Sequence, residues 1–256
     1  MKMKCFLVVV FSAVLSWVLF AGVAGTTPTQ EEFDEIVDRE MFKYMHGWDY
    51  IGAVNYWKSK GVTDGMFGRA YAKVARKTLH SLEEKGSKCY RAIDGVARFC
   101  TGEEQLTNLL YFAEHVAADN VRAHAIWVLS NKTTPVYFAA FAERVVASTN
   151  LGYHAASELM SCLSESYKKL DSRNTVWRTR ILQTMRRHLE VGGKGFAIAD
   201  HALVRHDSTY ANSEFRREMA LRLLDPQRSP LNGTKRIDRG RIEEELRKVL
   251  RKGNAR

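Results

Sequence analysis

The stretch TQEEFDEIVDREMFKYM, residues 29–45, predicts an α-helix from its start signal and from the spacing of its apolar side chains. Thr29 is followed three residues later by Glu32, which is the capping-box pattern of a helix N-terminus. Apolar residues then recur every three or four positions, at Phe33, Ile36, Val37, Met41, Tyr44 and Met45. This spacing puts them on one face of a helix, whereas a half-buried strand would need strict alternation.

The same pattern continues along most of the chain. Thr101 and Glu104 form a second capping-box pattern, and a stripe of apolar residues follows between Leu106 and Ala117. Thr134-Pro135 supplies a cap residue and a first-turn proline for a later helix. Further helices are expected at residues 67–82, 121–129, 135–148, 152–170, 175–190, 196–204 and 213–224. No segment shows sustained strand alternation, so we expect an all-α protein.

Composition divides the chain into four regions. Residues 1–25 open with two lysines and continue from Cys5 through apolar and small residues without a charge, which is the layout of a secretory signal peptide cleaved near Gly25. The apolar run is also long enough to span a bilayer, so a membrane anchor at residues 5–25 is the alternative. Residues 26–100 are an N-terminal helical region with a Gly- and aromatic-rich segment, residues 101–225 a second helical region, and residues 226–256 a basic tail. We therefore expect a secreted or periplasmic protein.

The excess of positive charge lies in the tail. Residues 226–256 contain ten Lys and Arg against four Asp and Glu, whereas residues 26–225 contain 27 basic and 25 acidic side chains. The nearly neutral body argues against a polyanion-binding face and against specific nucleic-acid recognition. The tail ends in an amphipathic helix whose apolar seam needs a partner surface: Ile242, Leu246, Val249 and Leu250. Residues 235–256 are thus a candidate for attachment to an anionic surface.

Three segments resemble one another, because each places a large apolar residue directly before an arginine near a helix start. They are residues 120–129 with Val121-Arg122, residues 176–182 with Trp177-Arg178, and residues 214–224 with Phe215-Arg216. This pattern resembles the second helix of HEAT-like repeats, over residues 103–225. The resemblance implies antiparallel helical hairpins stacked as an irregular α-α superhelix that binds another macromolecule, and it implies no catalytic residues. The alternative is a closed helical bundle of ordinary amphipathic helices.

The densest group of potential metal ligands in the chain is Asp200, His201, His206 and Asp207. A hydrolytic metal centre needs imidazole and carboxylate groups that converge on one point. In one continuous helix His201 and His206 diverge by roughly 140°, so convergence requires the helix to end between them. The alternative is that these are ordinary polar residues at a helix end.

An aromatic cluster lies among glycines, at Trp48, Tyr50, Tyr56 and Trp57. In an exported protein these rings are a candidate stacking platform for a sugar or a peptide. The alternative is that they are core residues that let short helices pack closely.

Three cysteines follow the leader, at Cys89, Cys100 and Cys162. A single helix over residues 88–100 would hold Cys89 and Cys100 about 16 Å apart, too far for a disulfide, whereas a break at Asp94-Gly95 would allow one. Asn131 and Asn232 each begin an Asn-x-Thr sequence, which is a glycosylation acceptor if the organism is eukaryotic.

The known catalytic signatures are missing from the chain, since it contains no Gly-rich phosphate loop, no Gly-x-Ser-x-Gly elbow and no His-Glu-x-x-His helix. We therefore expect an exported, non-enzymatic helical scaffold that binds a protein or envelope component and needs no cofactor. The alternative is an exported metal-dependent hydrolase that uses Asp200, His201, His206 and Asp207.

Overall fold

The computed structural model describes residues 27–43, 48–82, 88–148, 151–191, 196–210, 213–225 and 236–253, and these residues contain helices and no strand. The all-α prediction is confirmed. In chain order the elements are α2 Gln30–Arg39, the 3₁₀ turn η1 Met41–Lys43, α3 Trp48–Ser59, α4 Asp64–Lys77, α5 Lys88–Phe99, α6 Gly102–His115, α7 Asp119–Lys132, α8 Pro135–Ser148, α9 Tyr153–Lys169, α10 Thr175–Val191, α11 Phe196–His206, α12 Glu214–Leu224 and α13 Arg236–Gly253. The leader, residues 1–25, lies outside the described residues.

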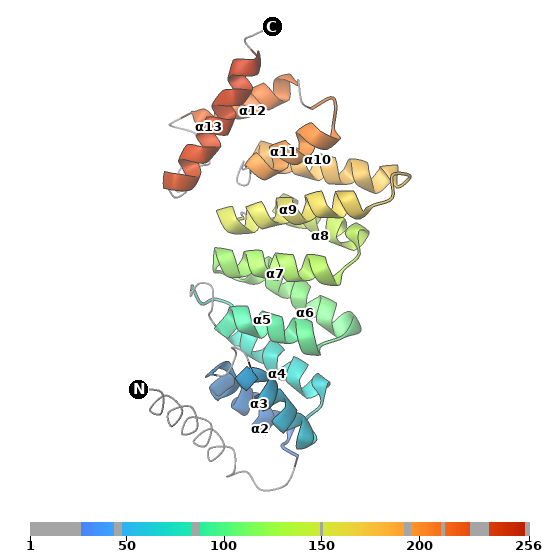
Figure 1. Cartoon of the computed structure of the whole chain (residues 1–256), viewed down its shortest axis with the longest axis vertical. Helices are drawn as coiled ribbons and strands as arrows, with labels where there is room; N and C mark the ends of the chain where they lie inside the picture. The colour runs from blue at the N-terminus through green and yellow to red at the C-terminus, as the bar shows by residue number, and fades with distance from the viewer. Residues whose placement is uncertain are drawn as a thin grey trace, which may run out of the picture.

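Helices from α4 onward pair into hairpins that stack along the long axis of the molecule (Figure 1). One layer of the column contains α5, α7, α9 and α11, each in contact with the next, and the other layer contains α4, α6, α8 and α10. Helices α2 and α13 lie at opposite ends of the column (Figure 1). Of the two arrangements that the sequence allowed, the molecule therefore has the stacked one and not the closed bundle.

The hairpins repeat at a nearly even interval. Their first helices begin at Asp64, Gly102, Pro135, Thr175 and Glu214. Successive starts are thus separated by similar lengths of chain, as in a helical repeat array. The three similar sequence segments do not share one position in this repeat. Residues 120–129 lie in α7, the second helix of its hairpin, whereas residues 176–182 and 214–224 lie in the first helices α10 and α12.

The arginines of those three segments nevertheless share a structural role, because each binds the preceding helix. The Arg122 Nε donates to the Ala113 carbonyl oxygen at 2.9 Å, near the end of α6. The Arg178 Nη1 donates to the Leu170 carbonyl oxygen at 3.1 Å, at the C-cap of α9. Because the last carbonyls of a helix have no partner within it, these guanidinium groups satisfy acceptors that would otherwise be left unpaired. Arg216 differs in binding the Asp200 side chain of α11.

The two predicted capping boxes have different outcomes. At α2 the box is complete, with the Thr29 hydroxyl accepting from the Glu32 amide and the Glu32 carboxylate accepting from the Thr29 amide. At α6 Thr101 is the N-cap but makes no side-chain cap hydrogen bond, so the second box is wrong. Gly102 begins this helix with a φ of +60°, a left-handed conformation that glycine adopts readily.

The aromatic core at the base of the column joins α2, α3, α4 and α5. The Phe33 ring lies 4.8 Å from Phe67 and 5.7 Å from Trp57 between ring centroids, and Phe67 stacks on Phe99 at 4.7 Å. All four side chains are buried. This core explains why a Gly- and aromatic-rich sequence forms regular helices here.

The last helix packs on the body of the protein. Helix α13 contacts α12 and α11, and Leu246 of its apolar seam is fully buried while Val249 and Leu250 are partly buried. The seam therefore has an intramolecular partner, and Arg247, Lys248 and Arg251 remain exposed on the outside of the helix. Among the described residues no helix has both the length and the apolar character needed to cross a membrane.

Candidate functional site

The predicted aromatic cluster is divided by the fold. Trp57 lies in the core with 3% of its surface exposed, and Tyr56 is half-buried beside it at 5.2 Å between ring centroids. Tyr50 is half-buried and its hydroxyl lies 3.4 Å from the hydroxyl of Tyr71. Trp48 begins α3, but its side chain lies outside what the structure describes.

The four predicted metal ligands lie between the middle of α11 and the residue just beyond its end. The Asp200 side chain is buried, and the Nε and Nη2 of Arg216 each donate to one of its carboxylate oxygens at 2.7 Å. The Tyr210 hydroxyl also donates to this carboxylate, at 3.0 Å. His201 is exposed. The Asp200 carboxylate therefore joins α11 to α12 through a bidentate ion pair.

Asp207 and His206 have partners of their own. Asp207 pairs with Arg186 of α10 and accepts from the Thr209 amide at 3.1 Å. The His206 ring lies 4.5 Å from the Tyr167 ring between centroids. Among the residues that the structure describes, no three His, Cys, Asp or Glu side chains gather as a metal-binding group.

The cysteines are free and buried in the structure. Helix α5 runs without a break through Asp94 and Gly95, and Cys89, Cys100 and Cys162 are all unbridged thiols. Asn131 lies in the last turn of α7 with an exposed side chain whose amide donates to the Trp127 carbonyl oxygen at 3.1 Å. Asn232 lies outside the described residues.

A row of aromatic rings crosses from α5 to α7 in one layer of the column. The Tyr90 ring stacks on the His124 ring at 3.8 Å between centroids and 15° between planes, and His124 stacks on Trp127 at 5.7 Å and 24°. The His124 Nε2 donates to the Asp94 carboxylate at 2.7 Å. We call Tyr90, Asp94, His124 and Trp127 the aromatic ladder.

Helix periodicity explains why these four side chains meet. Tyr90 and Asp94 are four residues apart on α5, and His124 and Trp127 are three apart on α7, so each pair shares one face of its helix. Because α5 and α7 are neighbours in the same layer, the two faces come together. The His124 side chain is only 9% exposed between its neighbours, and half of the Trp127 surface is open to solvent.

The ladder continues toward α3 through Arg98, which follows Asp94 by one turn on α5. The Arg98 guanidinium lies 5.2 Å from the centroid of the Tyr50 ring, within the range of a cation–π contact. Burial raises the pKa of the Tyr50 phenol, and the nearby Asp94 carboxylate adds to this effect. Tyr50 is therefore the member of the predicted aromatic cluster that reaches this surface.

Sequence reasoning missed Tyr90, Asp94, His124 and Trp127. Tyr90 and His124 are separated by the whole of α6, so only the stacking of two hairpins brings them together. Comparison of the chain with protein-family models, with curated proteins and with solved structures finds no match. Inference about function therefore depends on the geometry of the ladder.

The arrangement is suited to binding. The ladder holds a large aromatic ring, Trp127, at the surface, and stacking plus one hydrogen bond to Asp94 fix the His124 ring beneath it. Tyr, Trp and Arg are the residues that most often dominate the energy of protein interfaces. A ring that is already held in place loses little conformational entropy on binding, which favours affinity.

Proposed function

We infer that this protein is an exported, non-enzymatic helical scaffold of HEAT-like type that binds a protein or envelope component through the aromatic ladder. The observation that carries the proposal is the half-exposed Trp127 held over the His124–Asp94 pair. An interface gains from burying the apolar body of a half-exposed tryptophan, and the neighbours of Trp127 hold its ring in place for such a contact.

The HEAT-like part of the proposal is supported by the repeat itself. First helices recur at a nearly even interval, and the second helix of each hairpin contacts the second helix of the next. In such arrays each hairpin buries its apolar face on its neighbours, which leaves one helix of each pair to present a long binding surface. The ladder lies on two such neighbouring helices, α5 and α7.

The export part of the proposal rests on the leader sequence, with its short basic start and uncharged apolar run. An exported scaffold would meet proteins or envelope components outside the cytoplasm. The exposed basic residues of α13 are compatible with an additional attachment of residues 235–256 to an anionic surface.

Site-specific photocrosslinking in cells that export the protein tests the proposal. A benzophenone amino acid replaces Trp127 in one variant and Tyr137 in a matched control, because Tyr137 is 39% exposed on α8 in the other layer. We expect a discrete crosslinked product from position 127 and none from position 137. An added Asp94→Ala substitution removes the hydrogen bond that holds His124, and it should weaken the product at position 127.

The same experiment can refute the proposal. If position 127 gives no product, or if positions 127 and 137 give the same products, the ladder is not an interface. Helical circular dichroism of each variant shows whether the fold is intact, which keeps loss of folding distinct from loss of binding.

A further inference from the structure

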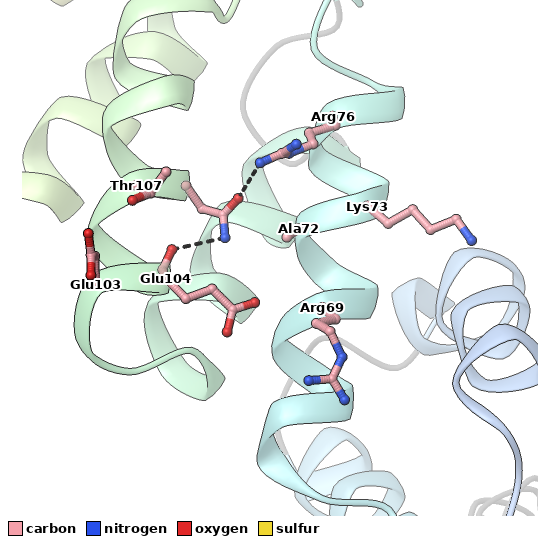
Figure 2. A pocket seen from close by; sticks show the side chains of 8 residues that line it. Arg69, Ala72, Lys73, Arg76, Glu103, Glu104 and Thr107 are labelled. Atoms are coloured by element: carbon pink, nitrogen blue, oxygen red, sulfur yellow. Dashed lines mark hydrogen bonds between the residues drawn. The ribbon is translucent and has the colours of Figure 1, made fainter.

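A groove lies between α4 and α6, in the layer opposite the aromatic ladder, with a volume of about 600 Å³ (Figure 2). This volume is within the range of roughly 300–1,000 Å³ that is usual for ligand sites. Its walls carry opposite charges, with Arg69, Lys73 and Arg76 on α4 and Glu103 and Glu104 on α6.

The α4 wall presents two guanidinium groups that are held by neutral partners. The Arg69 Nε donates to the Gln30 side-chain oxygen at 3.0 Å, and the Arg76 Nη2 donates to the Asn108 side-chain oxygen at 2.9 Å. Lys73, between them, is paired with Asp34 of α2. Arg69 and Arg76 are thus oriented without being neutralised, and they lie two helical turns apart, about 10 Å along the axis.

The α6 wall presents carboxylates because of the way in which helix α6 begins. Because the capping box at Thr101 does not form, the Glu104 side chain is not turned back to the helix N-terminus. Figure 2 shows it directed toward α4 instead. No ion pair between described residues joins Glu103 or Glu104 to the arginines across the groove. The side-chain amide of Asn108 lies between the walls and donates to the Glu104 carbonyl oxygen at 3.0 Å.

We propose that this groove binds an extended peptide segment in which acidic and basic side chains alternate. Successive side chains of an extended chain point to opposite sides, so alternation sends every acidic side chain toward α4 and every basic one toward α6. A segment with one sign of charge would be attracted by one wall and repelled by the other. The groove should therefore prefer peptides whose charges alternate in sign over peptides with a high net charge of one sign.

The peptide must also satisfy the spacing of the groove. Side chains that point to the same side of an extended chain lie about 6.6 Å apart, at two residues of about 3.3 Å each. An alternating hexapeptide therefore places three acidic side chains over about 13 Å, which covers the distance between Arg69 and Arg76. This site is independent of the aromatic ladder, because it lies in the other layer of the column.

Fluorescence anisotropy with labelled hexapeptides tests the proposal on the purified protein. The probes are an alternating Glu-Lys peptide, a block peptide with three Glu followed by three Lys, and a neutral alternating Gln-Ala peptide. We expect the alternating charged peptide to bind most tightly and its affinity to fall with added salt. Arg69→Gln and Glu104→Gln should each weaken it by up to about fivefold, the effect of one exposed charge contact.

Two further variants sharpen the test. Arg187 is an exposed arginine of α10, far along the column, and Arg187→Gln should leave the affinity unchanged. The double exchange Arg69→Glu with Glu104→Arg should bind the alternating peptide better than either single exchange, because a slip of one residue swaps the two sides of an extended chain.

The proposal is overturned if the alternating peptide binds no more tightly than the block or neutral peptide. It is also overturned if Arg69→Gln and Glu104→Gln bind like Arg187→Gln. Both altered side chains are exposed, so the variants should keep their helical circular dichroism, and that measurement accompanies each titration.

Discussion

Replacing Gly152 by alanine should destabilise the contact between two stacked hairpins. Gly152 is the N-cap of α9, and a Cβ atom there would lie 2.0 Å from a carboxylate oxygen of Asp119 in α7. Asp119 accepts hydrogen bonds from the amides of His154 and Ala155, at 2.7 and 3.2 Å, and so caps α9 from the neighbouring hairpin. The added methyl group must displace this carboxylate, and α9 then loses its cap.

The magnitude follows from the bonds that are lost. Loss of a cap costs about 1 kcal/mol of unfolding free energy, and bonds to a charged acceptor are worth somewhat more, so we expect about 2 kcal/mol for Gly152→Ala. Asp119→Ala should cost about 1.5 kcal/mol for the same reason. In the double variant the Asp119 carboxylate is absent, so the added methyl group displaces nothing. The total loss of unfolding free energy should therefore stay at about 2 kcal/mol instead of reaching the additive value of about 3.5 kcal/mol.

Urea denaturation followed by circular dichroism measures these free energies. Gly52→Ala is the matched control, because Gly52 lies inside α3 with no atom within 4 Å of an added Cβ. It should stabilise the protein by about 0.5–1 kcal/mol through helix propensity. Additive effects of Gly152→Ala and Asp119→Ala, or a Gly152→Ala variant as stable as the original, would refute the packing described for α7 and α9.

Three other predictions concern buried and paired groups. Arg216→Met should cost about 3 kcal/mol in the same denaturation assay, because it leaves the buried Asp200 carboxylate without its bidentate partner; a loss below about 1 kcal/mol would contradict this. The hydrogen bond from Lys77, with further help from Lys88, lowers the pKa of Asp38. At neutral pH the original protein should therefore have a higher free energy of unfolding than Asp38→Asn. This difference should vanish as the pH falls below about 3.9. Burial raises the pKa of the free thiols, to about 11 at Cys100 and about 12 at Cys162. A thiol reagent at pH 8 should therefore label Cys89, Cys100 and Cys162 only after unfolding, and labelling of just one of these three would indicate a disulfide.

Local sequence signals predicted the helices well. The Thr29 capping box, the Thr134-Pro135 start of α8 and the stop after α12 all lie where the sequence placed them. These signals depend on neighbours within one turn, so they carry over directly to the structure. The box at Thr101 does not form, and the next residue, Gly102, has a left-handed backbone conformation that residue types alone do not reveal.

Contacts between hairpins were beyond the reach of the sequence pattern. The aromatic ladder depends on the register of α5 against α7, and the polar groove on the separation of α4 from α6. The shared arginines were found in the sequence, but their role was not, because Arg122 binds a carbonyl oxygen and such an acceptor leaves no trace in residue identity. Long-range geometry of this kind comes from packing and not from local propensity.

Small-angle X-ray scattering of residues 26–256 tests the open stacked column most directly. A compact domain with the length of residues 26–256 would have a radius of gyration of about 17 Å. Five hairpins stacked at about 10 Å each, with α2 and α3 at one end, give a column whose radius of gyration is about 21 Å. An asymmetric distance distribution with the larger of these two radii is the expected result. A symmetric distribution with the smaller radius would contradict the stacked column and the surfaces inferred from it.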